Sequence, residues 1–142
     1  MRTIHFILFI FIALYAGNSF ADHLKVRNGY IPEGPPVARV LAGFMEIDNR
    51  SSDTVYIDSV SSPCFGAIEM HLSKEVDGVA RMFPQAQLVI EPQSTLVLRP
   101  GSYHLMMFNP TRKLKDGDPC VLTFTLGNGH SFDYTITVRK MN

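Results

Sequence analysis

Hydrophobic and polar residues alternate along much of the chain after residue 21, which is the pattern of half-buried β-strands. The clearest case is Phe132–Val138, where every second residue is apolar and the residues between are polar. Val121–Leu126 alternates in the same way, and Gly127-Asn128-Gly129 lies between the two segments. Glycine and asparagine favour the tight turns that join antiparallel strands, so this part of the sequence predicts a β-hairpin.

Further strand-like segments recur through the rest of the chain, and no helical periodicity persists for longer than about ten residues. Short stretches rich in Gly, Pro, Asn, Asp and Ser separate them, as expected of turns. Regular spacing of many short strands favours a Greek-key sandwich or barrel, so the fold class is all-β with a single domain. The remaining expected strands are Leu24–Asn28, Val37–Asp48, Val55–Val60, Ala67–Leu72, Gln87–Ile90, Thr95–Leu98 and His104–Phe108.

The first 21 residues have a different character. Arg2 is followed by the apolar run Ile4–Tyr15, and Ser19-Phe20-Ala21 places small residues at the positions that a signal peptidase reads. This pattern predicts a signal peptide over residues 1–21, cleaved after Ala21, and a mature domain over residues 22–142. The run is shorter than the roughly 20 residues that span a bilayer, so no stable membrane span is expected after cleavage. An uncleaved anchor is the alternative. No cysteine directly follows the run, so lipid attachment there is not predicted.

Charge and cysteine content narrow the function further. The chain balances 13 Lys and Arg against 13 Asp and Glu, with no basic stripe to attract nucleic acid. Its only cysteines, Cys64 and Cys120, both lie in the predicted exported part. A single pair in an oxidising compartment is usually a structural disulfide. Two free thiols that assist a metal remain the alternative.

Four residues carry the candidate chemistry: His71, Met82, His104 and Met106. Ten residues lie between the first two, 21 between Met82 and His104, and one between His104 and Met106. Neutral imidazole and thioether both bind copper(I), whereas thioether is a poor ligand for zinc, magnesium or calcium. Alternate residues of a strand share a face, so His104 and Met106 should project together. The segment Lys74–Gly78 is a plausible hairpin turn that would return Met82 beside His71.

The spacing of these four residues resembles the signature of the PCu(A)C family of periplasmic copper chaperones: His or Met, ten residues, Met, 21 residues, then His-x-Met. Neighbouring segments are also similar, and the likeness extends from about Leu24 to Val138. The family's frequent tryptophan and its His/Met-rich tail have no counterpart here. The cysteine pair lies outside the signature. The similar segments are Met45–Asn49, Ser61–Pro63, Gly101–Met106, Leu114–Asp118 and Leu122–Phe124.

The resemblance implies a cupredoxin-like β-sandwich that holds copper(I) in the periplasm at His71, Met82, His104 and Met106. It also implies a non-enzymatic role: delivery of copper to an extracytoplasmic acceptor, such as the dinuclear copper site of a cytochrome c oxidase subunit or another assembly chaperone. Two alternatives stay open. A blue-copper electron carrier requires two histidines and a cysteine thiolate, and Cys120 and His130 supply only part of that set. A secreted β-sandwich that binds proteins without metal would leave the four residues idle.

Overall fold

The computed structural model describes residues 23–141, and within this range it contains ten strands and no helix. No segment of the described chain is therefore a helix suited to crossing a membrane. The predicted signal peptide, residues 1–21, lies outside the described residues. The strands are β1 (Leu24–Pro32), β2 (Val40–Asn49), β3 (Val55–Ser61), β4 (Phe65–Val76), β5 (Val79–Pro84), β6 (Leu88–Ile90), β7 (Ser94–Leu98), β8 (Tyr103–Pro110), β9 (Pro119–Leu126) and β10 (Ser131–Arg139).

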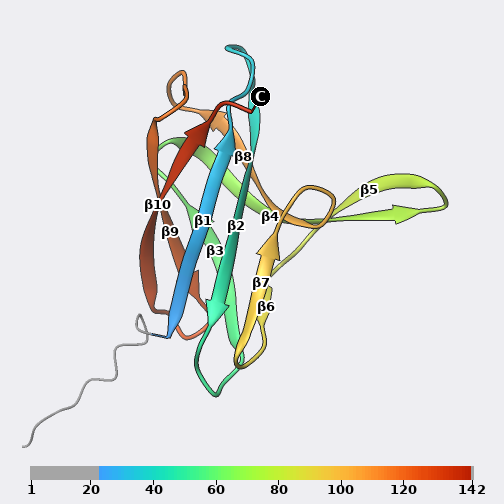
Figure 1. Cartoon of the computed structure of the whole chain (residues 1–142), viewed down its shortest axis with the longest axis vertical. Helices are drawn as coiled ribbons and strands as arrows, with labels where there is room; N and C mark the ends of the chain where they lie inside the picture. The colour runs from blue at the N-terminus through green and yellow to red at the C-terminus, as the bar shows by residue number, and fades with distance from the viewer. Residues whose placement is uncertain (1–22, 142) are drawn as a thin grey trace, which may run out of the picture.

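The ten strands form one continuous sheet in the order β5-β4-β8-β7-β2-β1-β10-β9-β3-β6, with an additional pairing of β8 with β2. The sheet folds back on itself, because β3 contacts β4 although these two strands do not pair (Figure 1). Neighbours such as β4 and β8, or β9 and β3, are distant in the sequence, as in a Greek key. The prediction of an all-β sandwich is confirmed.

The core lies between the two halves of the folded sheet, which form the two layers of the sandwich. It is formed by the apolar residues that alternate with polar ones along the strands. In β9, Cys120, Leu122, Phe124 and Leu126 are buried, while the residues between them are more exposed. The predicted hairpin is present, since β10 pairs antiparallel with β9 through the turn at Gly127–Gly129. Burial of the apolar face against the opposite layer is what makes this alternation a strand signal.

Several predicted boundaries are wrong: β1 runs on to Pro32, beyond the expected end at Asn28, and two other boundaries differ because of local turns. The second strand begins at Val40 and not at Val37, because Pro36 and Val37 form a turn in which the Ala38 amide donates to the Pro35 carbonyl. The hairpin turn predicted over Lys74–Gly78 is present but shorter: β4 continues to Val76, and only Asp77 and Gly78 turn the chain. Both turn residues have positive φ, 53° and 75°, as a two-residue hairpin requires.

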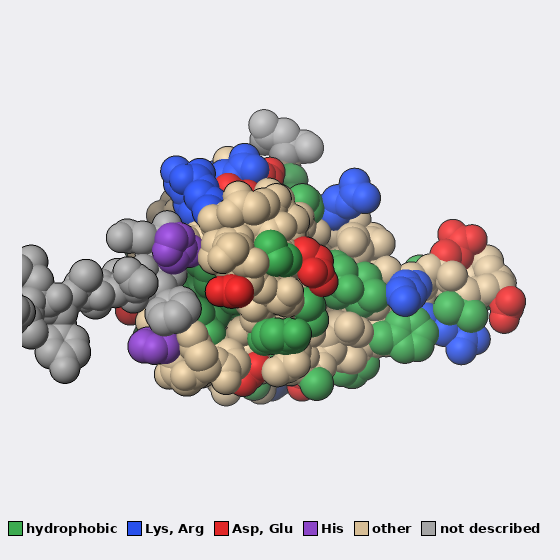
Figure 2. Space-filling model, turned by 90° about the horizontal axis from the view of Figure 1, so that it is seen from below, with side chains coloured by type: hydrophobic (Ala, Val, Ile, Leu, Met, Phe, Trp, Pro, Cys, Tyr) green, Lys and Arg blue, Asp and Glu red, His purple; other side chains and the backbone are tan. Residues whose placement is uncertain are grey.

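The β4–β5 hairpin projects from the sandwich as an arm (Figure 1). Every residue of β5 is exposed, and β5 forms one edge of the sheet. Figure 2 shows the arm from below, with acidic and basic side chains at its outer end. The sequence did not predict β5, because a strand without a buried face lacks the alternation by which strands are recognised.

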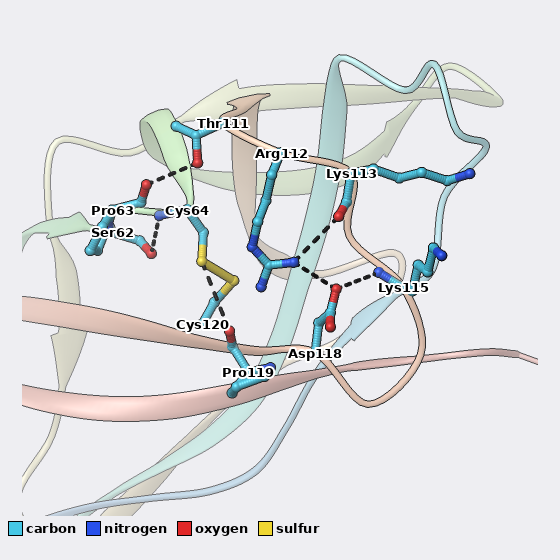
Figure 3. Close-up of a disulfide and its surroundings, with 10 residues drawn as sticks. All are labelled: Ser62, Pro63, Cys64, Thr111, Arg112, Lys113, Lys115, Asp118, Pro119 and Cys120. Carbon is cyan, nitrogen blue, oxygen red and sulfur yellow. Dashed lines mark hydrogen bonds and ion pairs between the residues drawn. A yellow bond between two sulfur atoms is a disulfide. The ribbon is translucent and has the colours of Figure 1, made fainter.

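Cys64 and Cys120 form a disulfide, with their Cα atoms 6.0 Å apart (Figure 3). Cys64 directly precedes β4, and Cys120 lies in β9. The bond therefore joins the residue before β4 to β9, and these two strands are far apart in the strand order of the sheet. Close to it, Arg112 forms an ion pair with Asp118 at 2.7 Å, and the Lys115 amide donates to the same carboxylate (Figure 3).

Candidate metal centre

His71 and His104 face each other across two neighbouring strands. His71 lies in β4 and His104 in β8, and they are direct partners in the antiparallel register. Their ring centroids are 5.9 Å apart, and both residues are buried, with 8% and 5% of their surfaces exposed. Their sequence neighbours Met70 and Leu105 belong to the apolar core. Because side chains alternate along a strand, the two histidines lie on the opposite face of the sheet from that core.

Each imidazole makes one hydrogen bond through one ring nitrogen. His71 Nε2 lies 2.8 Å from a carboxylate oxygen of Glu69, and His104 Nδ1 lies 3.0 Å from the backbone carbonyl oxygen of Ser102. The other two nitrogens, His71 Nδ1 and His104 Nε2, are buried and have no hydrogen-bond partner among the described residues. Buried polar atoms are almost always paired, so two unpaired nitrogens on facing rings point to a ligand that supplies the missing contact.

Met106 lies beside this histidine pair. It is two residues after His104 on β8, so it shares the same face, and its register partner on β4 is Glu69. Its side chain is partly buried. The thioether is therefore diagonal to His71, at a spacing that long side chains bridge in antiparallel sheets.

Met82 is on the same face but one strand further away, on the projecting arm. Its register partner is Ser73, and the partner of His71 is Pro84. With 59% of its surface exposed, Met82 is one of the more exposed large hydrophobic residues of the described chain. The structure thus brings together the two histidines, places Met106 next to them, and leaves the Met82 side chain largely in solvent.

The chemistry of this donor set fits copper(I). Within residues 23–141, no group of three or more His, Cys, Asp or Glu side chains is arranged to hold a metal ion. Any further ligand to a metal bound by the two imidazoles would therefore be of another kind, and the sulfur donors on this face are the thioethers of Met106 and Met82. Imidazole with thioether suits a soft monovalent ion, whereas hard cations prefer oxygen.

The disulfide is remote from this face. Cys64 precedes His71 by seven residues of extended chain, which corresponds to about 20 Å. Both sulfurs are committed to the bond, and the described chain contains no free cysteine. The alternative in which free thiols assist the metal is therefore excluded.

Sequence reasoning did not single out Glu69. Its position two residues before His71 on one strand is a usable signal, because alternation places both side chains on the same face. A carboxylate on the same face as a candidate histidine ligand can accept a hydrogen bond from the ring. The Ser102 carbonyl has no such signal, since any residue type supplies one.

Comparisons with known proteins agree with this architecture. Residues 24–138 match a family model described as "Putative lipoprotein LpqE-like". No curated protein matches the sequence significantly. Among solved structures, the copper-bound PCuAC domain from PmoF2 has a TM-score of 0.71 at 13% identity, over 84% of this chain and 94% of that domain. The apo PCuAC domain from PmoF1 has a TM-score of 0.72 at 14% identity, over 84% of this chain and 95% of that domain.

The copper(I) form of DR1885 from Deinococcus radiodurans is also similar, with a TM-score of 0.62 at 23% identity. The likeness covers 79% of this chain and 75% of that protein. At these identities the solved structures establish a shared fold.

Proposed function

Because the chain belongs to the LpqE-like family and has the β fold of PCuAC domains, we propose that it binds one copper(I) ion through His71, Met82, His104 and Met106. Copper is its cargo, and the protein catalyses no reaction of its own. The observation that carries the proposal is the pair of facing imidazoles whose remaining nitrogens are buried and unpaired. Two thioethers on the same face favour the reduced ion over copper(II).

We also propose that the ion is passed to another protein outside the cytoplasm. Met82 supports this step, because a largely exposed ligand on a projecting arm is open to attack by an incoming thiolate or thioether. The histidines are held in a rigid pair of strands and would release copper after Met82. The acceptor suggested by the family resemblance is the dinuclear copper site of cytochrome c oxidase or another assembly chaperone.

Export to the periplasm completes the proposal, with residues 1–21 as a cleaved signal peptide. The disulfide supports it, since such bonds persist in oxidising compartments. The mass of the protein recovered from the periplasmic fraction tests it: a mature chain that begins at Asp22 is expected.

Titration of the apo protein with copper(I) against a competing chelator tests binding. The wild type should bind one ion more tightly than micromolar, and Met82→Leu combined with Met106→Leu should weaken binding at least about tenfold, or 1.4 kcal/mol. Met70→Leu combined with Met107→Leu is the matched control, because these methionines lie in the core on the opposite face. Wild-type binding weaker than micromolar, or equal loss in both double variants, would overturn the proposal.

Transfer is tested separately. The copper-loaded protein is mixed with the apo copper-binding domain of the oxidase subunit, and the metal content of each is followed by native mass spectrometry. Movement of copper to the oxidase domain supports this acceptor. Retention by the loaded protein would remove the oxidase from the proposal without affecting copper binding.

The alternative of a blue-copper electron carrier is not supported, because the thiolate ligand that it requires is missing. That site requires a cysteine thiolate, and both cysteines of the chain are in the disulfide. The titration also tests the remaining alternative, a protein-binding module without metal, which predicts no specific copper(I) binding.

A further inference from the structure

The two histidines use opposite ring nitrogens for their hydrogen bonds. His71 contacts Glu69 through Nε2, whereas His104 contacts the Ser102 carbonyl through Nδ1. Carboxylate and carbonyl oxygens accept hydrogen bonds, so the ring nitrogen in each pair carries the proton. A neutral imidazole has only one such proton. In its neutral form, His71 is therefore the Nε2–H tautomer, and neutral His104 is the Nδ1–H tautomer.

The lone pairs then lie on the two nitrogens that have no partner, His71 Nδ1 and His104 Nε2. We propose that His71 binds copper(I) through Nδ1 and His104 through Nε2, and that Glu69 is the positioning residue that selects the His71 nitrogen. This inference rests on the proposed function. A hydrogen-bonded partner behind a metal-binding histidine fixes both the tautomer and the ring orientation.

Glu69 is well placed for this role. It lies two residues before His71 on β4, and its carboxylate reaches the ring at 2.8 Å. The Glu69 side chain is 55% exposed, whereas the His71 side chain is only 10% exposed. The carboxylate thus keeps contact with water while it holds a ring that is nearly enclosed. Its charge also favours a cation at the far side of the ring.

Glu69 acts through the histidine and not as a ligand of its own. Its Oε2 is engaged by His71 Nε2, on the side of the ring away from the unpaired Nδ1. Within the described chain, no set of three His, Cys, Asp or Glu side chains converges on one point, so Glu69 does not complete a site with the two imidazoles.

Nitrogen NMR of the two imidazoles tests the assignment in the apo protein and after loading with copper(I), which is diamagnetic. In the wild-type apo protein, His71 should appear as the Nε2–H tautomer and His104 as the Nδ1–H tautomer. Copper(I) should then shift the resonances of His71 Nδ1 and His104 Nε2. An Nδ1–H tautomer of His71, or copper-induced shifts at the opposite nitrogens, would overturn the inference.

Substitution of Glu69 separates its positioning role from general folding. Glu69→Leu removes the acceptor and should leave His71 as a mixture of tautomers, with copper(I) affinity reduced about tenfold. Glu69→Gln keeps an acceptor oxygen and should retain the tautomer and most of the affinity. Glu75→Leu is the matched control, because Glu75 is exposed further along the same face of β4. It should change neither quantity.

The two proposals fail in different ways. If the wild type does not bind copper(I), the proposed function is wrong and this inference falls with it. If the wild type binds copper(I) but Glu69→Leu binds it equally tightly, only the positioning role of Glu69 is wrong.

Discussion

Removal of the disulfide should cost this domain a large part of its stability while leaving the proposed copper site intact. Cys64 and Cys120 are separated by 56 positions in the sequence. Bridging them shortens the unfolded chain and lowers its conformational entropy, which corresponds to about 4 kcal/mol at 25 °C for a loop of this length. Domains of ordinary size are stable by about 5–15 kcal/mol, so the loss would be easily measured.

The perturbation is Cys64→Ala combined with Cys120→Ala, compared with the oxidised wild type. Alanine is preferable to serine because Cys120 is only 1% exposed and a buried hydroxyl would need a partner. Wild type measured in reductant controls for packing: it lacks the bond but keeps both sulfur atoms. The difference between reduced wild type and the double variant then gives the cost of the small cavity alone.

Guanidinium unfolding followed by far-ultraviolet circular dichroism is the appropriate assay, because the chain has no tryptophan to report by fluorescence. Extrapolated free energies of unfolding should be compared together with the midpoints, since a cross-linked unfolded state exposes less surface and has a smaller denaturant slope. Copper(I) affinity of the folded variant should match that of the wild type, because about 20 Å of strand separates Cys64 from His71. A stability loss below about 1 kcal/mol, well under the range for removing a native disulfide, would refute the entropic reasoning.

Three further predictions concern the scaffold. Arg27 and Thr95 hydrogen-bond the Asp48 carboxylate and hold its pKa below 3.8, so their stabilising effect is complete above that pH and is lost as the pH falls through the lower folded value. In thermal unfolding, Asp48→Asn should therefore be less stable than wild type at neutral pH, and the difference should narrow in acid. A difference in stability that stays constant with pH would contradict this. Asn49 is 1% exposed, and its side-chain amide donates hydrogen bonds to three backbone carbonyls. Asn49→Asp should therefore lower the free energy of unfolding in denaturant by about 3 kcal/mol. A loss under about 1 kcal/mol would show that these hydrogen bonds are dispensable. A Cβ at Gly29 would lie 2.5 Å from the Tyr134 ring, so Gly29→Ala should lower the free energy of unfolding by about 1–3 kcal/mol. In a Tyr134→Ala background the same substitution should cost much less, and an equal cost in both backgrounds would show that Tyr134 is not the source of the clash.

Alternation made most of the fold predictable from the sequence. β9 and β10 could be located because one face of each is buried and the other is not, and the glycines of the turn between them mark the hairpin. β5 escaped prediction for the same physical reason, since all of its residues are exposed. The start of β2 was misplaced because valine favours strands, while Pro36 and Val37 are in fact held in a turn.

The candidate site was predictable only in part. Alternation alone places His104 and Met106 on one face, and both lie in β8 as expected. The pairing of β4 with β8 is non-local, and nothing in either segment specifies that His71 is opposite His104. Register between distant strands is fixed by packing of the whole sheet, so the sequence supported that contact only through its spacing and its family resemblance.

Hairpin register also explains the position of Met82. A two-residue turn at Asp77–Gly78 pairs Val76 with Val79, and counting back along both strands then places Met82 opposite Ser73. A turn over all of Lys74–Gly78 would have paired Met82 with Met70 and so turned its side chain to the core face, away from His71. The length of one turn therefore decides that this thioether lies on the same face as His71 but two register pairs further out on the arm.

This offset bears on how a carrier can hold copper tightly and still release it. Two imidazoles that are buried and fixed by hydrogen bonds would lose little freedom on binding an ion, which favours tight binding. If Met82 binds the ion as proposed, its exposed side chain would become ordered, and this entropic cost would make it the weakest of the four contacts. In the proposed transfer, an acceptor that approaches the arm would therefore meet the most easily displaced ligand first. The position of Met82 on the arm would thus both weaken copper binding and speed copper release. A Met82 buried in the sandwich would have neither effect.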